Sequence, residues 1–117
     1  MIPFGDPSAS YQAHKSEIDQ AIKRVLDSGW YVLGTEVDAF EEEFASFHSK
    51  DLHAVGVANG TDAIALSLKS LGLGIGDEVI SPSHTAVATV AGIEQAGCIP
   101  VFADIDPITR CISAGCP

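Results

Sequence analysis

The stretch of sequence that decides the fold is Val55-Gly56-Val57-Ala58-Asn59-Gly60-Thr61-Asp62-Ala63-Ile64, an apolar run that breaks at Asn-Gly and continues as a helical pattern. We expect residues 54–58 to form a buried strand and Thr61 to cap a helix over 61–71. Backbone N–H groups left free at such a turn lie at the positive end of the helix dipole, which favours an anion. The pattern alone leaves two interpretations open, a phosphate site and an ordinary strand-to-helix connection.

Short apolar runs and helical patterns alternate from residue 54 onward. The order β-α-β-α-β predicts an α/β fold with parallel strands and right-handed crossovers. The predicted strands cover 54–58, 78–81 and 99–103, and the predicted helices cover 61–71 and 85–96. Ligands bind beyond the carboxyl ends of the strands in such sheets. We therefore expect three loops to share one edge, namely Asn59-Gly60-Thr61, Ser83-His84-Thr85-Ala86 and Asp104-Ile105-Asp106.

Two amphipathic helices are predicted before this region, over residues 16–28 and 36–48. Ser16 with Asp19 resembles a capping box, and Gly29 stands where a helix ends with a left-handed residue. Thr35 with Asp38 repeats the start signal for the second helix. The acidic run from 41 to 43 is interpreted as a solvated face. Residues 1–53 are thus an N-terminal helical segment.

Composition narrows the function classes. The 117 residues are 46% hydrophobic and 19% charged, and the net charge is −10, so a folded core is expected and nucleic acid or an anionic membrane would be repelled. The sequence has no long apolar run and no leader-like start, which predicts a cytoplasmic protein without a membrane partner. Cys98, Cys111 and Cys116 are interpreted as free thiols, and no metal site is predicted.

The glycines of Gly72-Leu73-Gly74-Ile75-Gly76-Asp77 are spaced somewhat like a dinucleotide-binding fingerprint. That fingerprint needs the order strand, glycines, helix. Here the glycines follow a predicted helix and precede a predicted strand. They are therefore interpreted as a turn, which disfavours an unrelated nucleotide-binding domain.

Taken together, these motifs resemble the DegT/DnrJ/StrS family of pyridoxal-phosphate-dependent sugar aminotransferases, which have the aspartate-aminotransferase-like fold (PLP fold type I). The resemblance covers nearly the whole chain. It rests on Ser28-Gly29-Trp30-Tyr31-Val32-Leu33-Gly34-Thr35-Glu36-Val37, Phe40-Glu41-Glu42-Glu43-Phe44, His53-Ala54-Val55-Gly56-Val57-Ala58-Asn59-Gly60-Thr61-Asp62-Ala63, Pro82-Ser83-His84-Thr85 and Pro100-Val101-Phe102-Ala103-Asp104-Ile105-Asp106-Pro107. It implies that residues 54–117 are the start of the PLP-binding α/β domain, truncated at the C-terminus.

The resemblance assigns site residues. Gly60 and Thr61 stand where the family binds the cofactor phosphate through backbone N–H groups and a hydroxyl. Asp62 would add a backbone N–H with its carboxylate turned toward the helix terminus, or would simply be a favourable first-turn acid. Ala86 stands where many relatives have an aromatic residue that stacks on the pyridine ring. His84 is a candidate replacement, or a capping or surface histidine.

The resemblance places the linker that contains Trp30 and Tyr31 near the active site at the dimer interface, although such a pair between helices is more often explained by local packing. The family reaction moves an amino group from a donor, usually glutamate, to a keto group on a nucleotide-linked sugar, as in amino-sugar and polysaccharide biosynthesis. A lysine forms a Schiff base with the cofactor, and an aspartate holds the ring nitrogen. The resemblance implies a homodimer for the full-length protein.

The lysines of this sequence do not match the Schiff-base segment, which the resemblance places downstream of residue 117. Lys15, Lys23, Lys50 and Lys69 are interpreted as surface charges. We therefore expect the N-terminal part of an aminotransferase, inactive alone and poorly soluble or oligomeric because its sheet is incomplete. Two alternatives stay open, a sugar dehydratase of the same family and a non-catalytic binding or regulatory module.

Overall fold

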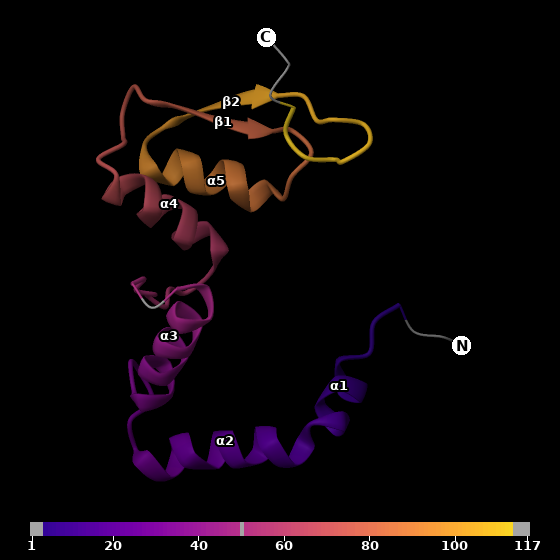
Figure 1. Ribbon diagram of the computed structural model, residues 1–117, viewed down its shortest axis with the longest axis vertical. Coiled ribbons are helices and arrows are strands. Elements are labelled where there is room, and N and C mark those ends of the chain that lie inside the picture. Colours follow the sequence, from indigo (N-terminus) through magenta and orange to yellow (C-terminus); the bar gives the residue numbers. More distant parts are fainter. Residues whose placement is uncertain (1–3, 50, 114–117) are drawn as a thin grey trace. The chain divides into compact units, whose positions relative to one another are not determined.

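The computed structural model describes residues 4–49 and 51–113. The chain forms two compact units, which lie within residues 1–56 and 57–117 (Figure 1). The first unit contains α1 (Pro7–Ala13), α2 (Lys15–Ser28) and α3 (Thr35–His48). The second contains α4 (Gly60–Ser70), β1 (Glu78–Pro82), α5 (Val87–Ala96) and β2 (Ile99–Ala103). None of the helices in the described ranges combines the length and apolar character that crossing a bilayer requires.

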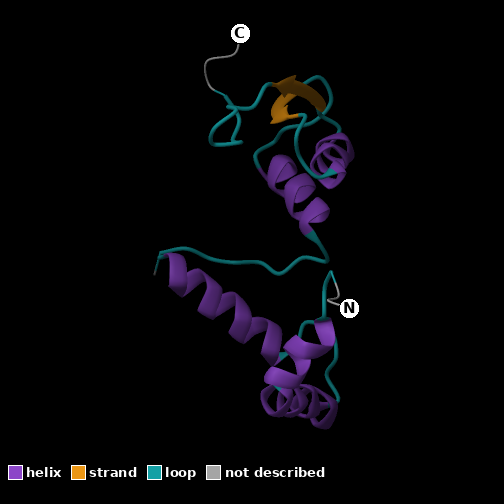
Figure 2. Ribbon diagram, turned by 90° about the vertical axis from the view of Figure 1, so that its right-hand side faces the viewer, coloured by secondary structure: helices purple, strands orange, loops and turns teal. Residues whose placement is uncertain are grey.

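A parallel sheet organises the second unit, as the alternating pattern predicted. β1 pairs with β2 in parallel, with Glu78 opposite Ile99 and Pro82 opposite Ala103. α5 connects the two strands, and both α4 and α5 lie on one face of the sheet with α5 next to the strands (Figures 1 and 2). The α/β class and the parallel pairing are therefore confirmed.

The core of the second unit lies where α5 meets α4 and the sheet. Ile93 and Ala96 on α5 are buried together with Cys98, which precedes β2. Half-buried apolar residues complete the cluster, namely Ile64, Leu68, Leu73 and Val79. The helical spacing of the α4 and α5 residues explains this core, because residues three and four apart share one helix face.

The predicted strand at 54–58 is wrong. These residues have no regular secondary structure, and Val55 and Val57 are 79% and 41% exposed. A strand exists only through pairing, and β1 and β2 pair only with each other among the described strands. The Gly56 N–H instead donates a hydrogen bond to the Glu41 carboxylate. The apolar run thus lacks a neighbouring strand to complete its backbone hydrogen bonds.

The first unit contains one helix that sequence analysis missed. Asp6 caps α1 by accepting a hydrogen bond from the Ala9 N–H at 3.1 Å, and Pro7 occupies the first helical position. α2 begins at Lys15, one residue before the predicted start. His14 separates α1 from α2, and its side chain makes no capping hydrogen bond. The capping box predicted at Ser16 is therefore wrong. The Ser16 hydroxyl instead accepts from Gln20 on the same helix.

Glycine signals were more reliable than the N-terminal caps. Gly29 and Gly97 end α2 and α5 with φ of 67° and 91°, in the left-handed region that favours glycine. α3 is capped by Gly34 and not by Thr35, which is its first residue. The glycines at 72–77 form the predicted turn, in which the Gly74 N–H donates to Asp77.

The thiols agree with their interpretation where they are described. Cys98 is buried and Cys111 is exposed, and both are free. Cys116 lies outside the described residues, as does Lys50.

Candidate functional site

The predicted phosphate site is the turn of residues 59–62 at the start of α4, called the phosphate turn here. The residue that caps the helix differs from the prediction. Asn59 is the N-cap, in an extended conformation, and its side-chain oxygen accepts from the Asp62 N–H at 2.9 Å. Thr61 lies inside the first turn and does not cap the helix. Sequence reasoning missed Asn59, although Asn followed three residues later by an acid is a readable start signal.

Two backbone donors stay available in this turn. The Asp62 N–H is taken by Asn59, whereas no hydrogen bond within the described part of the chain uses the Gly60 or Thr61 N–H. The space around Gly60 is open, because a Cβ built there would meet nothing within 4 Å. The first donors of a helix attract anions, and open space lets a phosphate oxygen approach them. The turn therefore fits a phosphate group.

The Asp62 side chain is turned toward the helix terminus. Its carboxylate accepts from the Asn59 side-chain amide at 3.0 Å, so Asn59 and Asp62 are linked twice. An acid in the first turn is also favourable for the helix dipole. The carboxylate is thus turned toward the helix terminus as predicted, and the backbone contribution of Asp62 to a phosphate stays a prediction, since its N–H donates to Asn59 here.

Residues 83–86 follow the carboxyl end of β1 and are called the ring-side loop here, because Ala86 stands where many relatives have an aromatic residue that stacks on the pyridine ring. Ala86 is the N-cap residue of α5 and is exposed, with φ −65° and ψ 139°. His84 is also exposed, and its side chain makes no hydrogen bond within the described residues. Neither residue is packed away from solvent. The structure therefore leaves both Ala86 and His84 accessible to a ligand.

Parallel pairing brings two of the three predicted loops to one end of the second unit. The loops that follow β1 and β2 leave the same end of the sheet (Figure 1). α4 reaches this region through α5, because a Cβ built at Gly92 would lie 2.9 Å from the Thr61 carbonyl oxygen. The phosphate turn and the helix that begins after Ala86 are thus in direct contact.

The loop after β2 is a turn closed by its own hydrogen bonds. The Asp106 carboxylate accepts from the Ile108 and Thr109 N–H groups at 2.9 and 2.7 Å. These hydrogen bonds, with the Thr109 backbone first, lower the pKa of Asp106 below its usual value. An antiparallel bridge between Ile105 and Ile112 closes the loop. Asp106 therefore serves the loop's own backbone.

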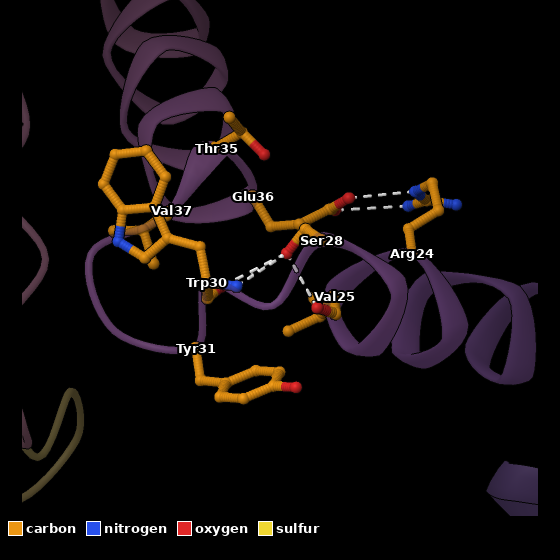
Figure 3. Close-up of a pocket in the computed structure, with 9 residues that line it drawn as sticks. Arg24, Val25, Ser28, Trp30, Tyr31, Thr35, Glu36 and Val37 are labelled. Atoms are coloured by element: carbon orange, nitrogen blue, oxygen red, sulfur yellow. Dashed lines mark hydrogen bonds and ion pairs between the residues drawn. The ribbon is translucent and has the colours of Figure 1, made fainter.

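Trp30 and Tyr31 line a pocket of about 230 Å³ in the first unit (Figure 3). Ser28 organises the linker by donating to the Val25 carbonyl at 2.7 Å and accepting from the Trp30 N–H at 3.1 Å. Arg24 forms two hydrogen bonds with Glu36 in the same pocket. The guanidinium lowers the pKa of Glu36, and its own charge is neutralised by that carboxylate. The pocket therefore offers aromatic surface without a free cation.

The described lysines are surface residues, as expected. Lys15 pairs with Asp19 and Tyr11, and Lys23 pairs with Asp27 at 2.8 Å. Lys69 is exposed in the last turn of α4, at the opposite end of that helix from Gly60 and Thr61. Within the second unit, the described lysine Lys69 is therefore not placed at the phosphate turn.

Comparison with known proteins identifies a family whose sequence pattern this chain matches. The sequence profile of the DegT/DnrJ/EryC1/StrS aminotransferase family matches residues 12–115. The erythromycin biosynthesis sensory transduction protein EryC1 of Saccharopolyspora erythraea is 51% identical over 100 residues, covering 86% of this chain and 27% of that protein. The dTDP-3-amino-3,4,6-trideoxy-alpha-D-glucose transaminase of Streptomyces venezuelae is also 51% identical over 100 residues, covering 86% and 26%.

A solved structure agrees with the fold. The crystal structure of NtdA from Bacillus subtilis with bound cofactor PMP has a TM-score of 0.81 and 33% identity, covering 86% of this chain and 23% of that one. The chain therefore spans about a quarter of the length of the proteins that it matches.

Proposed function

Because this chain belongs to the DegT/DnrJ/EryC1/StrS aminotransferase family, whose cofactor is pyridoxal phosphate, we propose that it supplies the cofactor-phosphate anchor of a nucleotide-sugar aminotransferase. The observation that carries this proposal is the pair of available N–H groups at Gly60 and Thr61, beside open space at the start of α4. Gly60 and Thr61 would bind the phosphate, and the Thr61 hydroxyl would add a third donor.

The other site residues have supporting roles. Asn59 would hold the first turn of α4 through its two hydrogen bonds with Asp62, one to the Asp62 N–H and one to its carboxylate. Ala86 would lie beside the cofactor ring, where a methyl group supplies less stacking than an aromatic side chain would. When bound, the cofactor supplies an electron sink for amino-group transfer.

The substrate and the partners belong to the same proposal. A transaminase relative acts on a dTDP-linked sugar, which supports a nucleotide-linked keto sugar as the amino acceptor. Glutamate as donor, assembly as a homodimer, a cytoplasmic location and a Schiff-base lysine outside these 117 residues complete it. Lys15 and Lys23 are paired with acids, and Lys69 lies at the opposite end of α4 from Gly60 and Thr61, which supports the last point.

Phosphate recognition is tested with pyridoxamine 5′-phosphate and pyridoxamine, measured by calorimetry on the 117-residue chain. These amines cannot form Schiff bases with surface lysines, so the comparison isolates the phosphate. We expect the phosphorylated ligand to bind at least about tenfold more tightly, since one hydrogen bond to a charged group contributes on that order. Equal affinities would overturn the proposal.

A pair of variants locates the effect. Thr61→Val removes the hydroxyl and keeps the backbone N–H and the β-branched shape, so the preference for the phosphorylated ligand should fall several-fold. Ser67→Ala removes an exposed hydroxyl further along α4 and should leave the preference unchanged. A transaminase assay of the chain alone, with glutamate and a nucleotide-linked keto sugar, should give no product, and turnover would contradict the placement of the lysine elsewhere.

The name of one relative favours a second function. EryC1 is described as a sensory transduction protein, which supports a non-catalytic regulatory module with the same fold. The coding sequence that follows Pro117 distinguishes the two functions. A lysine in a segment that matches the family's Schiff-base region supports the aminotransferase, and a different residue there supports the regulatory module or a dehydratase.

A further inference from the structure

We propose that Gly92 is a positioning residue that fixes the phosphate-binding turn of α4 against α5, the helix that begins beside the ring-side loop. This inference rests on the proposed function. It concerns a residue in the middle of α5 that would touch neither the phosphate nor the ring. Gly92 would act through the backbone of Thr61.

The observation is a close approach of the two helices. Gly92 is buried, and a Cβ built there would lie 2.9 Å from the Thr61 carbonyl oxygen and 3.0 Å from Ile64 Cβ. Glycine in a helix interior disfavours the helix, so such a position calls for a packing reason. The nearest atom belongs to the backbone and cannot rotate away as a side chain can. Any larger side chain at this position must therefore displace α4 itself.

The displaced group is part of the phosphate turn. The Thr61 carbonyl shares one peptide plane with the Asp62 N–H, which donates to Asn59. Moving that carbonyl therefore tilts the peptide that holds the N-cap hydrogen bond. The neighbouring N–H groups of Gly60 and Thr61 move with it, because residues 60–62 lie in the ring that the Ala63 N–H closes on the Asn59 carbonyl.

The same contact connects the two halves of the proposed site. Gly92 and Ala86 belong to one segment, since Ala86 is the N-cap of α5. A helix is stiff along its axis, so the position of Gly92 against Thr61 sets the distance between the phosphate turn and the ring-side loop. A ligand that bridges the two needs that distance to be constant.

The test compares Gly92→Val with Ala91→Val in the 117-residue chain. Ala91 is the preceding residue of α5 and is exposed, so its variant introduces the same β-branched side chain into the same helix without approaching α4. The measured quantity is the ratio of the dissociation constants of pyridoxamine and pyridoxamine 5′-phosphate. We expect Gly92→Val to lower this ratio by about tenfold, the effect of losing one charged hydrogen bond, and Ala91→Val to leave it unchanged.

The outcomes separate this inference from the proposed function. A wild-type chain without phosphate preference overturns the proposed function, whereas a preference that survives Gly92→Val overturns only the role of Gly92. Should Gly92→Val not fold, hydrogen exchange of the wild-type chain decides. Pyridoxamine 5′-phosphate should then protect amides in both 60–65 and 88–96, and protection confined to 60–65 would contradict the inference.

Discussion

Asn59 shows how one side chain can prepare a binding turn without contacting the ligand. Its oxygen satisfies the Asp62 N–H, and its amide holds the Asp62 carboxylate. The first turn is thereby ordered before any anion arrives, and its remaining donors belong to Gly60 and Thr61. Preorganised donors bind an anion without a further cost of ordering the backbone.

Replacing Asn59 tests this role through stability. Asn59→Ala removes the acceptor for the Asp62 N–H, and the free energy of unfolding should fall by about 1 kcal/mol, the usual effect of losing an N-cap. Asn59→Ser keeps an acceptor oxygen and should lie within a few tenths of a kcal/mol of the wild type. Urea denaturation followed by circular dichroism measures both. Equal losses in the two variants would show that Asn59 does not act as a cap.

Asp106 should make the stability of the fold depend on pH in the acidic range. Hydrogen bonds from the Thr109 and Ile108 N–H groups lower the pKa of the Asp106 carboxyl group below its usual range. A carboxyl group with a lowered pKa stabilises the fold above its unfolded pKa, and this contribution is lost as the pH falls through the folded value. The melting temperature of the wild type should therefore fall more below pH 4 than that of Asp106→Asn, which does not ionise. Parallel pH profiles of the two proteins would contradict this assignment.

At the scale of elements, the predictions from helical periodicity and from helix-ending glycines agreed with the structure, whereas the N-caps predicted at Ser16, Thr35 and Thr61 did not. Helical periodicity located α2 and α3 to within one residue at each end, and Gly29 and Gly97 ended their helices as expected. The predicted strand was wrong because a strand needs a pairing partner, which a local sequence pattern does not reveal. The run at 54–58 is apolar enough for a strand but has no described strand beside it.

The candidate site was predictable in part for the same reason. Gly60 and Thr61 follow from the Asn-Gly turn and the family resemblance. The hydrogen bond from the Asp62 N–H to the Asn59 side chain depends on side-chain geometry, so sequence reasoning did not predict it. The approach of Gly92 to Thr61 joins residues far apart in the sequence, and periodicity within one helix does not reveal it.

Gly97 and Gly74 lie beside the C-terminus of α5 and differ in whether their backbone conformation requires glycine. Gly97 has φ 91°, so Gly97→Ala should lower the free energy of unfolding by about 1 kcal/mol. Gly74 has no positive φ, and its nearest contact for an added Cβ is 3.9 Å away. Gly74→Ala should therefore be neutral or stabilising by up to about 1 kcal/mol. Thermal melts of the two variants give the comparison, and a reversed order would refute it.

At the scale of the whole chain, the described residues include many more exposed large apolar side chains than buried ones. The buried apolar residues of the described chain are Ala65, Ile93, Ala96 and Cys98. Large exposed apolar residues occur in both units, including Phe44 and Phe47 on α3 and Ile80 and Phe102 on the strands. A two-stranded sheet also leaves unpaired backbone groups along both outer edges. Surfaces of this kind promote association of chains with one another.

Self-association is therefore the expected state of the isolated chain. Size-exclusion chromatography with light scattering should give a mass above the 12.2 kDa of one chain, increasing with concentration. Ile80 is 65% exposed on β1, and Ile80→Thr keeps a β-branched residue while removing apolar surface, so it should shift the mass toward one chain. Glu78→Gln on the same strand leaves the apolar surface intact and serves as the control. A monodisperse wild-type monomer with a cooperative melt would show that the exposed apolar residues do not drive association, and an equal shift in both variants would show that the loss of apolar surface at Ile80 is not the cause.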